Sequence, residues 1–289
     1  MSKKVFSYCF FKPLTMPKMR FWDSSMDDFD RYYYNIPAVL LSNLILFPDY
    51  TTRIYITDNI LENSLSEIFN VVQSDLIEFY EIKLDYKLTE PMVFRMEPLW
   101  SEIDMFHTRD MDSVPTEIEY RYLKCFEKSG CGVGTIRTHQ NHYGFGCCMM
   151  GGLSSFVPHL VPEGIKGPSF SDYYNNGHGN YGMDQDLLIS YFTKDNEYTK
   201  DYFYDCMSYN QKNQQHFPCK ICSHDDLQSI DVEDYKMELF EKLKSCGHDN
   251  WAGEPIDARG EYTDFVLDKF PEVRKSIKQN DELRKFYGQ

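Results

Sequence analysis

The amino-acid sequence predicts an α/β fold with a mostly parallel central sheet flanked by helices. Three observations indicate it: strand and helix patterns alternate over the first hundred residues, the helical segments carry apolar residues along one stripe, and the composition is globular. With 289 residues, 16% of them aromatic and 26% charged, the chain can bury a substantial core. A β-α-β-α-β order implies right-handed crossovers between parallel strands.

The elements follow from local pattern. In chain order we expect a strand at 5–11, a helix at 29–47, a strand at 53–57, a helix at 60–72, a strand at 76–82, a helix or irregular stretch at 92–100 and a strand at 103–108. The first strand is a short aromatic run that ends before Pro13, and the first helix ends at Pro48. The second helix shows one apolar stripe.

A further helix is expected directly after the last of these strands. Thr116 and Glu119 have the spacing of a capping box, and the helix would run to about Lys128 and stop at Gly130. The remainder is less regular: residues 183–192 resume a helix pattern, 194–234 are polar without a clear period, and 269–289 read as one solvated C-terminal helix. No repeat or linker divides the chain, so we expect a single domain with a loop-rich C-terminal half.

Charge and composition restrict the classes of function. The formal net charge is −15, which argues against a nucleic-acid partner and suits a protein that holds a divalent cation. The longest apolar run, residues 36–47, is far below membrane-spanning length, and the N-terminus has no signal-peptide core or cleavage site. Nine scattered cysteines fit reduced thiols, so we expect a cytoplasmic protein without a membrane span.

The motif Arg109-Asp110-Met111-Asp112-Ser113 is the main candidate for chemistry. Asp110 and Asp112 follow a predicted strand, at the edge where open parallel sheets bind ligands. Two carboxylates there can face one Mn²⁺ or Mg²⁺ ion, which can bridge the phosphates of a nucleotide, while Arg109 can pair with the same phosphates. The alternative is a solvated turn that caps the next helix.

Four other features are candidates, each with a structural alternative. Gly151-Gly152 permits close backbone approach to a ligand, or forms a tight turn. Asp184-Gln185 begins a helix, where the carboxylate can act as a general base or only favour the helix N-terminus. His248 can complete a cation's ligand shell, or be structural. Cys219-x-x-Cys222 has the spacing of a zinc knuckle, although packed thiols are the simpler interpretation.

The order of these motifs resembles a group of GT-A glycosyltransferase-like proteins found in bacteria, large viruses and eukaryotic microbes. The residues that carry the resemblance are Phe106-x-x-Arg109-Asp110-x-Asp112-Ser113, Ile136-Arg137-x-His139-x-x-His142, Gly151-Gly152 and Tyr181-Gly182-x-Asp184-Gln185. It covers roughly residues 5–192 and, weakly, Cys246-Gly247-His248. This chain departs from the group at Thr138, where an acid is frequent, and at Leu153-Ser154-Ser155, where tryptophan-glycine is frequent.

The resemblance implies a single GT-A-type, Rossmann-like domain. About 1–115 would bind the nucleotide sugar, about 116–268 would form the acceptor side with an insertion near 194–234, and 269–289 would add the C-terminal helix. It also implies roles for the candidate residues: a metal on Asp110, Asp112 and His248, nucleotide-sugar contacts from Arg95, Arg109, Asp110, Asp112, Gly151 and Gly152, and catalytic roles for Asp184 and Gln185.

The implied activity is a Mn²⁺- or Mg²⁺-dependent transfer of sugar from a UDP- or GDP-sugar to a hydroxyl on a glycan, protein or small molecule. Two alternatives stay open at this point. One is a nucleotidyltransferase or nucleotide-sugar hydrolase that uses the same D-x-D metal site, and the other is a non-enzymatic binding protein stabilised by zinc.

Overall fold

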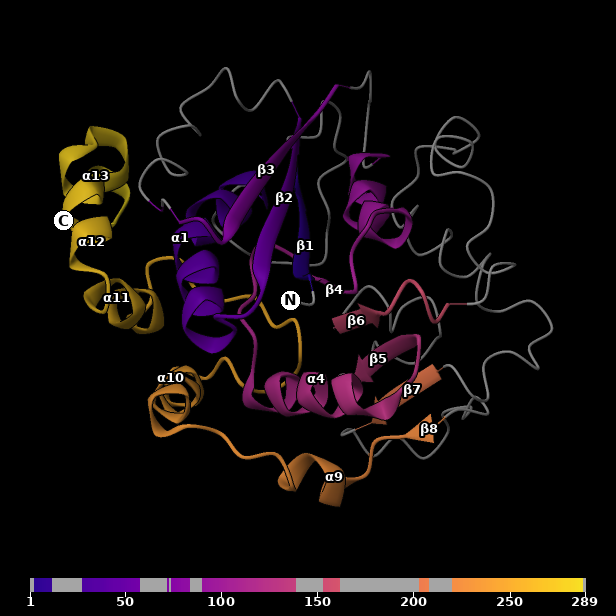
Figure 1. The fold of residues 1–289 in the computed structure, drawn as a ribbon. Helices are drawn as coiled ribbons and strands as arrows, with labels where there is room; N and C mark the ends of the chain where they lie inside the picture. The colour runs from indigo at the N-terminus through magenta and orange to yellow at the C-terminus, as the bar shows by residue number, and fades with distance from the viewer. Residues whose placement is uncertain are drawn as a thin grey trace.

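The computed structural model describes residues 3–11, 28–57, 72, 74–83, 90–138, 153–161, 203–207 and 220–287. An eight-stranded sheet runs through the molecule in the order β3-β2-β1-β4-β6-β5-β7-β8 (Figure 1). The strands are β1 (Lys4–Phe10), β2 (Thr51–Thr57), β3 (Ile77–Ile82), β4 (Met105–Thr108), β5 (Val133–Arg137), β6 (Leu153–Phe156), β7 (Phe203–Met207) and β8 (Lys220–Ile221). Among these described strands only β6 pairs antiparallel with its neighbours, so the predicted mostly parallel α/β sheet is confirmed.

The first half of the sheet positions the acidic motif. The chain builds β1, β2 and β3 outward in one direction and then returns to place β4 on the other side of β1. The strand order therefore reverses between β1 and β4, and open α/β sheets bind ligands outside the carboxyl ends of the strands at such a point. β4 ends at Thr108, so Asp110 and Asp112 follow immediately at this edge.

Two helices cover opposite faces of β1. Successive side chains of a strand point to opposite faces of the sheet, so neighbouring residues of β1 contact different helices. Phe6 packs against Phe47 with ring centroids 4.8 Å apart, on the face covered by α1 (Asp28–Leu46). Ser7 points the other way, and its hydroxyl donates to the backbone carbonyl of Arg95 at 2.7 Å in η1 (Glu90–Trp100), a 3-10 helix. The segment predicted as helical or irregular is thus η1, and it lies against the sheet beside the motif strand.

The helix after the motif, α4 (Glu117–Ser129), begins and ends as its sequence predicts. Thr116 accepts from the Glu119 amide while the Glu119 carboxylate accepts from the Thr116 amide, which forms the predicted capping box. Gly130 ends the helix with φ of 70°, a left-handed conformation that glycine adopts without strain. α4 lies on the same face as α1, where Tyr120 packs against Phe47.

The C-terminal half contains more regular structure than its sequence predicts. β7, β8 and α9 (His224–Gln228) all lie within the polar stretch 194–234, for which no element was expected. The helix predicted over 269–289 is two helices, α12 (Pro271–Gln279) and α13 (Asp281–Tyr287). Asn280 causes the break, because its backbone is extended and its side-chain oxygen accepts from the Leu283 amide as a cap.

The other C-terminal helices form an outer layer beside α1. α10 (Asp234–Ser245) and α11 (Glu261–Asp268) contact α1. α12 and α13 continue from α11 beside α1 (Figure 1). The Tyr34 ring of α1 stacks on Phe286 of α13 with centroids 3.4 Å apart. Within the described ranges, no helix is both long enough and apolar enough to cross a bilayer.

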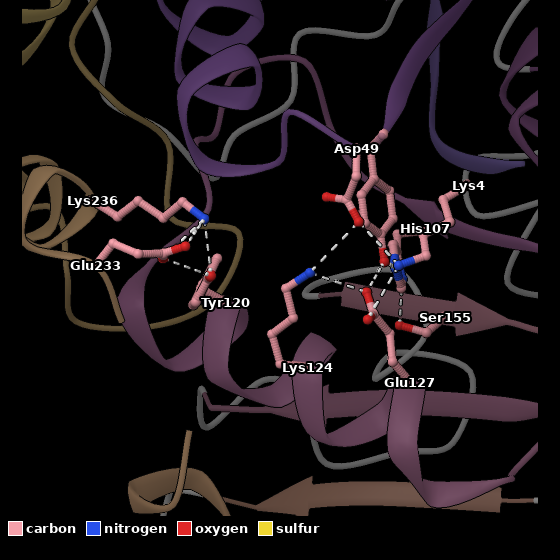
Figure 2. Close-up of polar contacts among 10 residues, drawn as sticks. Lys4, Asp49, His107, Tyr120, Lys124, Glu127, Ser155, Glu233 and Lys236 are labelled. Carbon is pink, nitrogen blue, oxygen red and sulfur yellow. Dashed lines mark hydrogen bonds and ion pairs between the residues drawn. The ribbon is translucent and has the colours of Figure 1, made fainter. Parts of the chain in front are cut away.

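A buried polar network joins the sheet to α4 at the amino edge of β1 and β2 (Figure 2). His107 of β4 is fully buried, with Nδ1 2.7 Å from the Ser155 hydroxyl and Nε2 3.2 Å from the Tyr50 hydroxyl. Tyr50 donates in turn to Glu127, whose carboxylate pairs with Lys4 at 3.2 Å. Burial lowers the pKa of His107 well below its usual value, and nearby Lys124, Lys4 and Arg109 lower it further.

The neutral, buried His107 predicts a pH dependence of stability. Above about pH 6.5 the imidazole is neutral in both the folded and unfolded chain and contributes no slope. As the pH falls below that value, only the unfolded chain takes up the proton, so the free energy of unfolding falls by up to about 1.4 kcal/mol per pH unit. Urea denaturation between pH 7.5 and 5 should show this slope, and His107→Gln should remove that part of it.

The difference in slope between the starting protein and His107→Gln reports on His107, because the carboxylates contribute equally to the pH dependence of both proteins. His159→Gln, at an exposed histidine, is the matched control and should leave the profile of the starting protein unchanged. Parallel pH profiles for the starting protein and His107→Gln would contradict the prediction.

Candidate functional site

The candidate site is the edge of the sheet where β4 and β5 end. Asp110 and Asp112 follow β4, and Thr138 follows β5. β6 runs antiparallel, so its first residues lie at the same edge: Ser154 pairs with Thr108 and Leu153 with Ile136. The backbone therefore brings the starts and ends of three neighbouring strands together beside the acidic motif.

Arg109 anchors the motif from inside the protein. Its side chain is completely buried, and its guanidinium donates to the Glu119 carboxylate and, at 3.0 Å, to the Ser113 hydroxyl. Glu119 is the same residue that closes the capping box of α4. The sequence prediction that Arg109 contacts phosphates stays a prediction, whereas its described contacts hold the turn between β4 and α4 in place.

Each aspartate of the motif is paired with an arginine from a different element. Asp110 Oδ1 lies 2.6 Å from Arg95 of η1, and the Asp110 side chain is 31% exposed. Asp112 Oδ2 lies 3.0 Å from Nε of Arg31 in the first turns of α1, and its side chain is 3% exposed. Arg95 also donates to the backbone carbonyl of Arg109 at 3.4 Å. η1 and α1 cover opposite faces of β1, and the two carboxylates lie between these helices.

The electrostatics show that the two carboxylates influence each other. Burial, together with the negative charge of Asp110 and against the attraction of Arg31, raises the pKa of Asp112 to about 7. The partly buried Tyr32 lies near both groups; desolvation raises its pKa, and the charges of Asp112 and Asp110 raise it further. Two mutually repelling carboxylates at a partly open sheet edge are an arrangement that a cation stabilises.

This donor set fits Mg²⁺ or Mn²⁺. Mg²⁺ in phosphate-binding proteins is commonly held by one or two carboxylates plus substrate phosphates and water, so a pair of aspartates suffices. Over the described part of the chain, no group of three or more His, Cys, Asp or Glu side chains is arranged to hold a metal by itself. His248 is therefore not gathered with Asp110 and Asp112 into a protein-only metal site, and its metal role stays a prediction.

A structural role accounts for the Gly247-His248 pair. The Gly247 amide donates to Lys244 at 3.0 Å and the His248 amide to Leu243 at 3.2 Å, with Gly247 at φ of 80°. These two bonds are the Schellman arrangement that ends α10. The half-buried His248 side chain follows that cap.

The segment after His248 crosses the candidate site. We refer to residues 251–256 as the C-terminal strap. The Ala252 amide donates to the Thr138 hydroxyl at 2.6 Å, the Ile256 amide donates to the Asp112 carbonyl at 2.9 Å, and Pro255 bridges to Ser113. The strap therefore fastens the backbone of the motif to the end of β5.

Several predicted residues lie outside the described ranges: Gly151, Gly152, Asp184, Gln185 and Cys219. The same holds for His139 and His142 of the resemblance. Cys222 is described and buried. The nucleotide-sugar, catalytic and zinc roles of the undescribed residues remain predictions.

Sequence reasoning missed Arg31, Tyr32 and the strap. Arg31 and Tyr32 carry a positional signal, because a helix that follows the first strand of a β-α-β unit begins at the carboxyl edge of the sheet. The strap carries no such signal. It reaches the site from more than a hundred residues away through backbone hydrogen bonds, which side-chain patterns do not report.

Comparisons with known proteins give remote likenesses only. No protein-family model matches the chain, and no curated protein shows significant similarity to it. Among solved structures, a protein from Desulfovibrio desulfuricans G20 described as a nucleotide-diphospho-sugar transferase is 13% identical, with TM-score 0.43, over 96% of this chain and 99% of that one. The 4-diphosphocytidyl-2C-methyl-D-erythritol synthase of Anaerococcus prevotii DSM 20548 is 10% identical, with TM-score 0.40, over 78% and 95%.

The buried Arg109–Glu119 pair predicts a large and specific loss of stability. Glu119→Gln keeps a side chain that can close the capping box but leaves the buried Arg109 charge without its counter-charge. Removing one partner of a buried pair costs about 3–5 kcal/mol. Urea denaturation should therefore show a loss of this size in the free energy of unfolding.

Glu117→Gln is the control, in the same turn of α4. Glu117 pairs with Arg121 at 2.7 Å, but it is 33% exposed, so its loss should cost no more than about 1 kcal/mol. Similar costs for the two substitutions would show that the Arg109–Glu119 pair is not what holds this turn.

Proposed function

We propose that the chain binds a nucleoside-diphosphate sugar through a divalent cation on Asp110 and Asp112, and transfers the sugar to a hydroxyl acceptor. The observation that carries the proposal is the position of two electrostatically coupled carboxylates just after the carboxyl end of β4, at the reversal of strand order. The sequence resemblance to GT-A glycosyltransferase-like proteins supports the same chemistry.

The surrounding residues suit a diphosphate. Arg31 and Arg95 place two guanidinium groups beside the carboxylates, and guanidinium groups bind phosphate through paired hydrogen bonds. A formal charge of −15 on the whole chain repels a polyphosphate, so a cation and local arginines are what such a ligand requires.

Within this proposal each described residue has a defined task. Asp110 and Asp112 would hold Mn²⁺ or Mg²⁺, which as a Lewis acid neutralises charge that develops on a departing diphosphate. Arg109 and Glu119 keep the turn rigid, and a rigid turn lets the carboxylates bind without reorganisation. Asp184 and Gln185 are proposed on the acceptor side, with Asp184 as a base toward the hydroxyl.

Loss of either aspartate should abolish cation-dependent nucleotide binding. A ligand at about a hundred times its Kd stabilises the native state by about 2.7 kcal/mol, which raises Tm by several degrees. We expect UDP or GDP with Mn²⁺ to produce such a shift in the starting protein, and Asp110→Asn and Asp112→Asn to lose it. Asp264→Asn, which also removes an arginine-paired aspartate (3.1 Å from Arg274), should retain it.

Product analysis distinguishes transfer from the related chemistries. Incubation of a UDP- or GDP-sugar with and without hydroxyl acceptors should yield a new glycoside only when an acceptor is present. Free sugar formed at the same rate without an acceptor would indicate a hydrolase instead. A Mn²⁺-dependent thermal shift that survives in both aspartate variants would exclude the proposed cation site.

A further inference from the structure

The pairing of each motif aspartate with its own arginine has a consequence for how ligands enter. Arg95 is 3% exposed and lies 2.6 Å from Asp110, while Arg31 is 16% exposed and lies 3.0 Å from Asp112. When both carboxylates are ionised, the two guanidinium groups neutralise them, and the four charges sum to zero. A cation that binds the aspartates must therefore displace the charge-assisted hydrogen bond from Arg95 to Asp110 and the ion pair between Arg31 and Asp112.

Charge balance shows what the site accepts. A divalent cation alone brings the four residues to a net charge of +2, in a place where three of the four side chains are less than a fifth exposed. A diphosphate carries one negative charge on each phosphate, so a nucleoside-diphosphate sugar alone brings the site to about −2. Buried charge without compensation is costly, whereas cation and diphosphate together leave the site near neutral.

We propose that Arg31 and Arg95 are exchange ligands. They pair with Asp112 and Asp110 in the free protein and with the diphosphate once a divalent cation has taken the carboxylates. Cation and nucleotide then bind as a cooperative unit, each raising the affinity for the other by the same factor. This inference rests on the proposed function and adds to it the identity of the groups that couple the two ligands.

Removing one arginine gives a signature of opposite sign for the two ligands. Without Arg95, Asp110 is no longer neutralised, so the affinity for Mn²⁺ alone should rise by about fivefold or more. The same change leaves the diphosphate one guanidinium short, so the affinity for UDP or GDP at saturating Mn²⁺ should fall by about fivefold or more. A residue that only stabilises the fold would weaken both.

Isothermal titration calorimetry of the full chain tests this with Mn²⁺ alone, and with UDP or GDP at saturating Mn²⁺. The variants are Arg95→Gln and Arg31→Gln, so that the more exposed Arg31 still gives a result if Arg95→Gln does not fold. Arg53→Gln is the matched control: Arg53 is 4% exposed and lies 2.9 Å from Glu78, which is 33% exposed, so the pair closely resembles Arg95–Asp110.

The outcomes separate the inference from the function on which it rests. Tighter Mn²⁺ binding with weaker nucleotide binding in an arginine variant, and neither change in Arg53→Gln, supports the exchange. If the starting protein binds both ligands but the arginine variants weaken both or alter neither, the exchange is wrong and the proposed function stands. If the starting protein binds neither UDP nor GDP with Mn²⁺, the proposed function fails, and the exchange fails with it.

Discussion

The candidate site depends on one buried ion pair, between Arg109 at the end of β4 and Glu119 in the first turn of α4. Both side chains are completely excluded from solvent. Glu119 uses its second carboxylate oxygen to accept from the Thr116 amide at 2.9 Å, and Arg109 also holds the Ser113 hydroxyl. The turn that carries Asp110 and Asp112 is therefore tied at both ends to the core, and the aspartates extend from a backbone that has little freedom to move.

Hydrogen bonds at both edges of the sheet further fix the strand that leads into this turn. At the carboxyl edge, the C-terminal strap bonds to the Asp112 carbonyl and to Thr138, so residues late in the chain complete the surroundings of the motif. At the amino edge, the network from Ser155 through His107 and Tyr50 to Glu127 bonds β4 and β6 to α4. β4 is thus held on both sides, and these polar contacts make the backbone that carries Asp110 and Asp112 rigid.

The sequence predicts what local pattern determines and misses what long-range pairing determines. The strands up to β4 and the helices α1 and α4 carry local signals: short runs rich in apolar and aromatic residues, apolar residues at helical spacing, and the Thr116–Glu119 capping box. β7 has five residues inside a polar stretch and forms through its partner β5, 66 or more residues earlier in the chain. Arg109 shows the same limit at the site. Its position beside two aspartates in the sequence predicts phosphate binding. In the structure, the carboxylate oxygen of Glu119 that the capping box does not use forms a buried ion pair with Arg109.

Arg31 and Arg95 give the acidic motif a chemistry that two carboxylates alone lack. Neither residue is near the motif in sequence, and each comes from a helix on a different face of β1. Each guanidinium group lies 3.0 Å or less from a carboxylate of the motif. A strongly acidic chain therefore keeps, at one edge of its sheet, equal numbers of positive and negative charges in a small volume. Under the proposed function, such a site would discriminate by total charge and favour a cation and a diphosphate arriving together over either one alone.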